Sequence, residues 1–386
     1  MMANLIDYVK WRGDLPFDMF PLCEIDAAIL SQVAYWNMDG IVPEDPKETM
    51  SMTALCQSAV LEELPPYCSE EDRTLKELLG TAERFKDLTL SGYVNEIDPE
   101  QETQFAAVTF SFGKKKQFVA FRGTDDSLAG WKECMDLAYY EEVKAQQKAV
   151  RYLEQIAAVT RGELYIGGHS KGGNLAVYAG AFCPDKINHR IMAIYNFDGP
   201  GFNQKVLEKD LFKKNQYRVH TFLPQDSLVG MLLIHQEAYQ VVHSNASNGI
   251  SQHHLVTWEC GPKQFAYAQK LTEAGENTGE TIREWLDSMS YEEKQHFIAV
   301  LYDLVDEYKT VGQLFTAKNL YKVMQEYRGM DKDKKKIVAD AVGILRKSLV
   351  GDMIDDVKDT YQGVKETYQE VKEKVTDKIR QVQNKK

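Results

Sequence analysis

A serine stands between two glycine pairs in the segment GGHSKGG, residues 167–173. The residues ELYI before it favour a strand, and the run NLAVYAGAF after it favours a helix. A chain that passes directly from a strand into a helix turns sharply, and only small side chains fit inside such a turn. The segment therefore predicts a strand that ends at Ile166, a tight turn that carries Ser170, and a helix over about residues 171–182.

Residues 168–172 fit the pattern G-x-S-x-G, in which the turn presents the serine hydroxyl. Free N–H groups at the start of the following helix point toward any negative charge that develops there. Such a serine reacts when a base, itself held by a carboxylate, removes its proton. The pattern predicts a nucleophile at Ser170, and the competing interpretation is a glycine-rich turn with a solvent-facing serine.

Strand and helix patterns alternate around this turn. Two apolar runs joined by Gly-Lys-Lys-Lys predict a hairpin, a long helix lies within residues 131–159, and further strand-like runs follow the serine. Helical patterns precede them at residues 24–36 and 73–85. The alternation predicts an α/β fold with a doubly wound, mostly parallel sheet. Besides the strand before the turn, the strand-like runs are residues 104–112, 117–123, 190–198, 217–223 and 237–244.

The carboxylate and the base are expected at positions that follow the serine in the sequence. In enzymes whose catalytic residues occur in the chain order serine, acid, histidine, the acid follows the second strand after the serine. This rule selects Asp226, and Asp198 is the fallback. The loop after residue 244 reads QHHLVTW, so either His253 or His254 is the candidate base.

A second donor for a developing oxyanion is expected beside the backbone N–H of Lys171. In FVAFRGTDD, residues 118–126, a strand ends before Thr124 and leaves the N–H of Thr124 free, with its hydroxyl nearby. The alternative is an ordinary turn at the end of a strand, with Arg122 in a structural ion pair.

Three of these segments together resemble a known group of enzymes. AFRGT, GHSKGGNLA and FLPQDSLVG, in this order, resemble the class 3 (triacylglycerol) lipase-like α/β-hydrolases. Longer stretches, among them IDYVKWRGDLPF, ILSQVAYW and FRGTDDSLAGWKE, are similar to the Mbeg-like family of bacterial proteins, which are predicted hydrolases. The similarity covers most of residues 3 to about 265.

This resemblance implies an α/β-hydrolase fold and a role for each matching residue. It implies Ser170 as nucleophile, Asp226 as orienting acid, and Thr124 with Lys171 at the oxyanion hole. The family pattern reads Q-H-D in the histidine loop, which implies His253 as the base and makes His254 a departure from the pattern.

Composition limits the partners and the compartment. The 46 basic and 58 acidic residues give a net charge of −12, which argues against nucleic acid as a partner. Six scattered cysteines without C-x-x-C pairs, no secretory signal and no apolar run long enough to span a bilayer predict a cytoplasmic protein. No spacing of ligands predicts a metal site, and no motif predicts a cofactor.

Changes in pattern divide the chain into three parts. We expect the hydrolase domain over residues 1–265, a helical extension over 266–350, and a heptad-repeat helix over 351–386. Residues 43–67, bounded by prolines, are either a mobile cover or a connection. For residues 352–386 three uses stay open: self-association or docking of a partner helix, a solvated helix, and contact with a membrane surface.

Taken together, the sequence predicts a serine hydrolase that cleaves an ester or thioester of a small molecule or lipid through an acyl-enzyme on Ser170. The alternative is a hydrolase fold without catalysis, which binds a partner through its helical C-terminal extension.

Overall fold

The computed structural model describes residues 3–348, except residues 59–63, 66–67, 99, 102, 126, 139, 248, 306, 311–312 and 314–316. The expected heptad helix, residues 351–386, lies outside the described residues, and so does part of the segment 43–67. The chain divides into two compact units, Met1–Gln295 and His296–Lys386. This division falls further along the chain than the boundary expected at residue 265.

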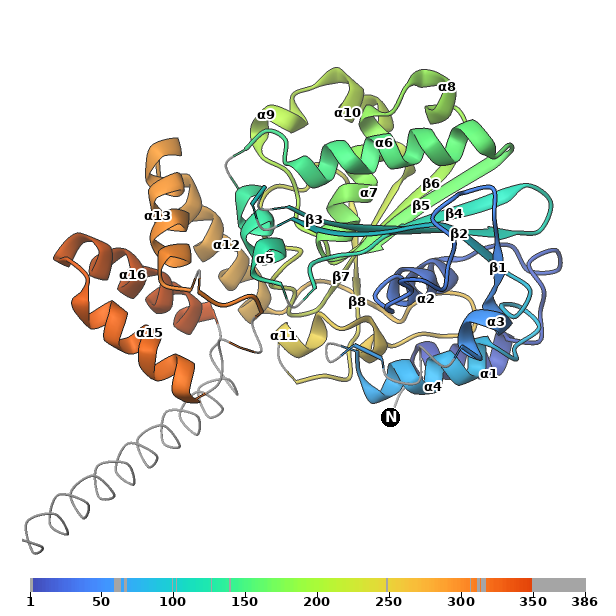
Figure 1. The fold of residues 1–386 in the computed structure, drawn as a ribbon, viewed down its shortest axis with the longest axis horizontal. Helices are drawn as coiled ribbons and strands as arrows, with labels where there is room; N and C mark the ends of the chain where they lie inside the picture. Colours follow the sequence, from blue (N-terminus) through green and yellow to red (C-terminus); the bar gives the residue numbers. More distant parts are fainter. Residues whose placement is uncertain are drawn as a thin grey trace, which may run out of the picture. The chain divides into compact units, whose positions relative to one another are not determined.

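A nine-stranded sheet forms the centre of the first unit in the described part of the chain (Figure 1). The strands lie side by side in the order of the sequence. The four neighbouring pairs from β4 to β8 are parallel, and the remaining pairs are antiparallel. The strands are β1 (Met50–Ser51), β2 (Thr89–Asp98), β3 (Thr103–Phe112), β4 (Lys116–Phe121), β5 (Glu163–His169), β6 (Ile191–Phe197), β7 (Val219–Pro224), β8 (Tyr239–Val242) and β9 (Tyr267–Ala268).

The helices of the first unit cover both faces of this sheet. Figure 1 shows α6 to α10 gathered on one face and α1 to α4 on the other. The helices are α1 (Leu5–Arg12), α2 (Glu24–Val33), α3 (Met52–Cys56), α4 (Glu70–Leu79), α5 (Leu128–Asp136), α6 (Lys144–Val159), α7 (Lys171–Phe182), α8 (Asp185–Asn188), α9 (Gln204–Leu207), α10 (Asp210–Asn215), α11 (Gly249–Gln252) and α12 (Glu273–Asp287), with 3-10 turns η2 (Gln216–Arg218) and η3 (Leu255–Thr257).

The α/β class is confirmed, but the expected doubly wound order is wrong. In a doubly wound sheet the strand order reverses, so that right-handed crossovers place helices on both faces. Here the strands are added in one direction, and the crossover helices share one face. The helices on the opposite face come from the segment that precedes the central strands.

Burial on both faces explains the nearly continuous apolar character of the central strands. In β4, Phe118 and Ala120 pack into the core on the side of α1 to α4. Their neighbours Val119 and Phe121 pack into the core under α6 and α7. Successive side chains of a strand point to opposite faces, so one short segment contributes to both cores.

Several expected elements are confirmed with small shifts of their ends. The helices expected at residues 24–36 and 73–85 are α2 and α4, and the expected hairpin is formed by β3 and β4. The long helix expected within residues 131–159 is α6, and the shorter α5 precedes it. The sequence pattern missed β2, which carries a register shift between Ser91 and Val94 that interrupts its alternation.

The second unit is helical where the structure describes it, and α13 (Tyr291–Asp303) leads into it from the first unit. The other helices are α15 (Ala317–Gly329) and α16 (Lys332–Ser348). Ser290 and Glu293 form a capping box: the Ser290 N–H donates to Glu293 Oε2 at 2.7 Å, and the Glu293 N–H donates to Ser290 Oγ at 3.2 Å. None of the helices in the described ranges has both the length and the apolar character needed to cross a bilayer.

A buried ion pair anchors the N-terminal helices to one another. Arg84 donates to both carboxylate oxygens of Asp26, at 2.7 and 2.6 Å, and both side chains are fully buried. The remaining donors of Arg84 reach the carbonyl oxygens of Leu15, Phe20 and Pro21. Because each charge is compensated, removal of either partner leaves the other charge buried without one.

Replacement of Asp26 should therefore strongly destabilise the first unit. We expect Asp26→Ala to lower the free energy of unfolding by about 3–5 kcal/mol, because it leaves the Arg84 guanidinium buried without a carboxylate partner. Urea unfolding followed by tryptophan fluorescence measures this, since all five tryptophans lie in the first unit. The control is Glu70→Ala, which breaks an exposed ion pair with Arg73 and should cost about 1 kcal/mol or less. Equal effects of the two substitutions would contradict the prediction.

Candidate active site

The serine turn forms where the sequence predicts it, between β5 and α7. Ser170 has φ 58° and ψ −136°, a backbone conformation that a residue with a side chain rarely adopts. Such a conformation costs about 1–3 kcal/mol and persists only when its surroundings hold it. The Ser170 N–H donates to the carbonyl oxygen of Phe197 at 2.9 Å, which ties the turn to the end of the adjacent strand β6.

Close packing around the turn explains the glycines. A Cβ atom at Gly172 would lie 2.0 Å from the carbonyl oxygen of Phe121, which no side chain can occupy. A Cβ atom at Gly123 would lie 2.6 Å from the carbonyl oxygen of His169 and 2.9 Å from Cβ of Ser170. The end of β4 and the segment after it therefore pass directly against the serine turn.

Lys171 contributes its backbone to this site and sends its side chain elsewhere. The residue is fully buried, and its Nζ donates to Gln104 O and Gln104 Oε1 at 2.8 Å and to Glu133 Oε2 at 2.9 Å. Glu133 Oε1 accepts from the N–H of Ala145 at 2.9 Å. The ammonium group is thus neutralised away from Ser170, while the Lys171 N–H lies at the first position of α7, where no intrahelical acceptor exists.

Thr124 follows the close approach at Gly123. Its hydroxyl oxygen is buried, and among the described residues it forms no hydrogen bond that meets normal geometry, although the Cys134 thiol lies beside it. Burial raises the pKa of Cys134, so this neighbour is a neutral thiol. Arg122 is bound to Asp125 Oδ2 at 2.9 Å, which is the structural ion pair that the sequence left open. The Thr124 hydroxyl therefore has hydrogen-bonding capacity to spare beside the serine turn.

A carboxylate and an imidazole meet next to this turn. His253 Nδ1 lies 2.6 Å from Asp198 Oδ2. Asp198 is fully buried, and its other oxygen accepts from Ser227 Oγ at 2.5 Å and from the N–H of Gly230 at 3.1 Å. Since an ionised carboxylate only accepts hydrogen bonds, His253 carries a proton on Nδ1, and its Nε2 is left free to accept one.

Asp226 does not contact His253, so the expectation that it orients the histidine is not met. Its Oδ2 accepts from Gln252 Nε2 at 2.8 Å, and its Oδ1 accepts from the Thr272 hydroxyl. Asp226 follows β7, which is two strands from β5, whereas Asp198 follows β6, which is paired with β5. The fallback residue is therefore the one that lies close to the serine turn.

His253, and not its neighbour, faces Asp198. The side chain of His253 is 19% exposed, whereas His254 is an exposed residue that precedes the turn η3. The described residues include no hydrogen bond between Ser170 and His253. Catalytic contacts of this kind are often long before substrate binds and shorten in the complex.

His169 and Tyr35 hold the His253 backbone, and the sequence indicated neither role. His169 Nε2 lies 2.7 Å from the carbonyl oxygen of His253, so it donates, and Nδ1 accepts from the Tyr35 hydroxyl at 3.0 Å. The rings of His169 and His253 lie 4.4 Å apart between centroids. The His169 side chain thus links the serine turn to the histidine loop.

Together the described geometry unites four of the five expected residues. Ser170, Lys171, Thr124 and His253 lie around one turn, and Asp198 takes the place expected for Asp226. No group of three or more metal-ligating side chains occurs among the described residues. The arrangement brings together a hydroxyl, an imidazole held by a carboxylate, and backbone N–H groups.

Comparison with known proteins identifies one family. The model of the family described as Mbeg1-like matches residues 79–303, which is more than half of the 386 residues and includes every residue of the site except Tyr35. Among solved structures, the chain is similar to the crystal structure of M37 lipase, with 15% sequence identity and a TM-score of 0.33, over 54% of this chain and 69% of that one. No curated protein matches the chain.

The buried His169 should make stability depend on pH. Burial, together with the nearby His253 ring, lowers the pKa of His169 well below its usual value. The unfolded chain therefore takes up a proton first, near pH 6.5, and stability is lost as the pH falls below that value, by up to about 1.4 kcal/mol per pH unit. We expect His169→Asn, which keeps a donor but does not titrate, to lose less stability between pH 7 and pH 5.

Urea unfolding at several pH values, followed by tryptophan fluorescence, compares the two proteins. Groups other than His169 contribute to both curves, so the difference in slope isolates this residue. Parallel curves for wild type and His169→Asn would show that His169 is not held neutral by its surroundings.

Proposed function

Because the chain belongs to the Mbeg1-like family and carries a buried carboxylate–imidazole pair beside a strained serine turn, we propose that it is a serine hydrolase with the α/β-hydrolase fold. Its substrate is a carboxylic ester or thioester, which it cleaves through an acyl-enzyme on Ser170. The observation that carries this proposal is the 2.6 Å contact between His253 and Asp198 next to the turn of Ser170.

In the proposed reaction, His253 Nε2 takes the proton of Ser170 while Oγ attacks the carbonyl carbon of the substrate. The carbonyl π electrons move to oxygen, and the resulting oxyanion accepts hydrogen bonds from the Lys171 and Thr124 N–H groups and from the Thr124 hydroxyl. The tetrahedral intermediate collapses, the bond to the leaving group breaks, and the protonated His253 gives its proton to the departing alkoxide or thiolate.

The second half of the reaction repeats these steps with water. His253 removes a proton from a water molecule, whose oxygen attacks the acyl carbon of the acyl-enzyme. The second intermediate collapses, the bond to Ser170 breaks, and the serine recovers its proton from His253. One ester and one water thus give one carboxylic acid and one alcohol or thiol.

Asp198 is the orienting acid in this proposal. Its carboxylate fixes the Nδ1–H tautomer of His253 and stabilises the imidazolium that forms in each half-reaction. His169 holds the histidine loop from the other side by donating to the His253 carbonyl oxygen, and the Tyr35 hydroxyl donates to His169 Nδ1. The six cysteines are all unpaired, which supports a reducing, cytoplasmic location.

Labelling with a fluorophosphonate probe tests the nucleophile. We expect the full-length protein to be labelled at Ser170 and Ser170→Ala to be unlabelled, because the probe reacts only with an activated serine. Intact-mass and peptide mass spectrometry locate the modification. Ser288→Ala, which removes an exposed serine at the end of α12, is the matched control and should be labelled like wild type.

A folded wild-type protein that resists labelling would contradict the proposal and favour the scaffold alternative, in which the extension binds a partner. A series of p-nitrophenyl esters from acetate to palmitate then reports the length of the acyl group.

The two aspartates are distinguished by kinetics on the best ester of that series. We expect Asp198→Asn to lower kcat by about 10⁴, because an amide at this position favours the wrong tautomer of His253. Asp226→Asn should stay within about tenfold of wild type, because Asp226 acts on the loop and not on the ring. Thermal unfolding checks that both variants fold. A larger loss in Asp226→Asn than in Asp198→Asn would show that Asp198 is not the acid.

A further inference from the structure

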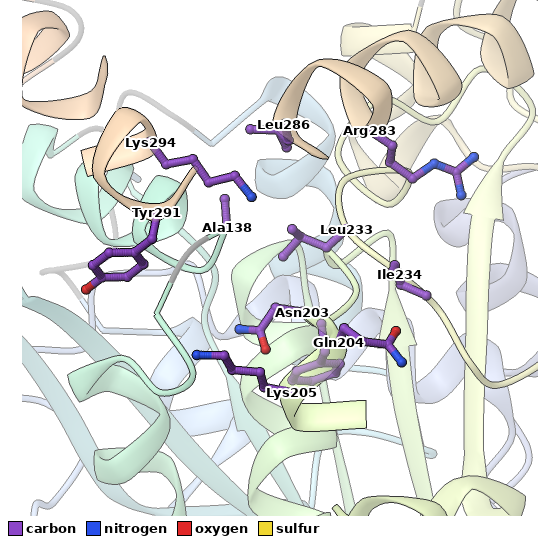
Figure 2. A pocket seen from close by; sticks show the side chains of 11 residues that line it. Ala138, Asn203, Gln204, Lys205, Leu233, Ile234, Arg283, Leu286, Tyr291 and Lys294 are labelled. Carbon is purple, nitrogen blue, oxygen red and sulfur yellow. The ribbon is translucent and has the colours of Figure 1, made fainter. Parts of the chain in front are cut away.

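A pocket lies where loops follow the ends of the parallel strands (Figure 2). Its volume is about 280 Å³, near the lower end of the range of ligand pockets, about 300–1,000 Å³. Its walls come from the segments that follow β4, β6 and β7, and from helices α12 and α13. Ligands of parallel sheets bind at this edge, where loops follow the carboxyl ends of the strands.

The wall of this pocket continues directly from Asp198. Phe202, four residues after Asp198, exchanges backbone hydrogen bonds with Ile234, at 2.9 and 3.1 Å. Ile234 in turn follows Gly230, whose N–H binds the Asp198 carboxylate. A ligand that fills the pocket therefore contacts the same two loops that hold the acid of the proposed reaction.

One side of the pocket is apolar. Phe202, Leu233, Ile234 and Leu286 all line it. Leu233 is held at φ 64°, a left-handed conformation that costs a residue with a branched side chain about 1–2 kcal/mol. The loop thus keeps a strained leucine at a position where glycine would relieve the strain, and its side chain faces the pocket.

Cations line the remaining sides. Lys294 and Arg283 are half-buried, and neither has a carboxylate partner among the described residues. Lys205 also lines the pocket, and its weak pair with Glu141 spans 3.5 Å at an exposed position. Figure 2 shows Lys294 above Leu233 and Lys205 below it in the view, with Arg283 on the right. Burial therefore partly desolvates Lys294 and Arg283, whereas Lys205 is exposed.

We propose that this pocket binds the phosphate group of an amphipathic ligand, with the attached hydrocarbon on the apolar wall. Cations on different walls of one pocket suit a dianion such as phosphate, to which Arg and Lys form charge-assisted hydrogen bonds. If the proposed function holds, on which this last step rests, the ligand is the substrate, an acyl ester or thioester whose alcohol or thiol part carries a phosphate.

Isothermal titration of the full-length protein with dodecyl phosphate, below its critical micelle concentration, tests the proposal. Dodecyl maltoside has the same hydrocarbon without the charge, and inorganic phosphate has the charge without the hydrocarbon. We expect dodecyl phosphate to bind at least tenfold more tightly than either. Equal binding of dodecyl maltoside would overturn the role of the cations, and equal binding of inorganic phosphate would show a site for the free ion.

Variants assign the binding to this pocket. The double variant Lys294→Ala/Arg283→Ala should weaken the binding of dodecyl phosphate roughly ten- to hundredfold, because it removes two charged donors. Lys213→Ala/Lys214→Ala, which removes two exposed cations on α10 outside the pocket, is the control and should bind like wild type. The same loss in both double variants would mean that overall charge governs binding, and no loss in the first would overturn the proposal.

Leu233→Gly tests the apolar wall, and glycine accepts the φ of 64°. It should weaken dodecyl phosphate binding at least fivefold. Because Leu233 also packs against the core, thermal unfolding checks that the variant is folded. Unchanged binding would overturn the role of this wall. Binding is also measured with Ser170→Ala, which lacks the proposed nucleophile. The binding result therefore does not depend on whether the protein is a hydrolase. Fluorophosphonate labelling in turn tests the hydrolase proposal without a bound phosphate ligand.

Discussion

The contact between Asp198 and His253 connects three parts of the chain that are far apart in sequence. Asp198 follows β6, His253 follows α11, and the backbone of His253 is held by His169 from the serine turn. Because Asp198 is fully buried, its charge must be compensated, and Ser227, Gly230 and His253 together use its oxygens. Removal of one partner from a buried charge costs about 3–5 kcal/mol, so the same contact that directs the imidazole also fixes the loops around it.

The N-terminal helices do more than cover one face of the sheet. The ion pair of Asp26 and Arg84 fixes α2 in its layer, and Tyr35, just after α2, donates its hydroxyl to His169. A rigid helix layer therefore supports the ring that holds the histidine loop. Catalytic groups keep their geometry when residues behind them are locked by packing and hydrogen bonds, which explains how residues outside the matched family segment contribute to the site.

The sequence predicted the local features of the site and missed those that depend on the order of strands. The turn at Ser170, the helix after it and the candidate base His253 follow from glycine spacing, helix pattern and resemblance, each readable within a few residues. The choice between Asp198 and Asp226 depends on which strand pairs with β5, and no local pattern encodes that. The winding of the sheet was missed for the same reason, and β2 was missed because its bulge interrupts the alternation.

Backbone strain gathers at the edge of the sheet where the site lies. Among the described residues, four that are not glycine have positive φ: Lys115 in the hairpin, and Ser170, Asp198 and Leu233 after β5, β6 and β7. Each of the last three sits next to backbone hydrogen bonds that hold the strained conformation: Ser170 to Phe197, Asp198 to Phe222, and the Phe202–Ile234 bridge beside Leu233. Strained residues of this kind cluster at active sites and ligand-binding loops, and here three of them lie on successive loops at the edge of the sheet that carries Ser170.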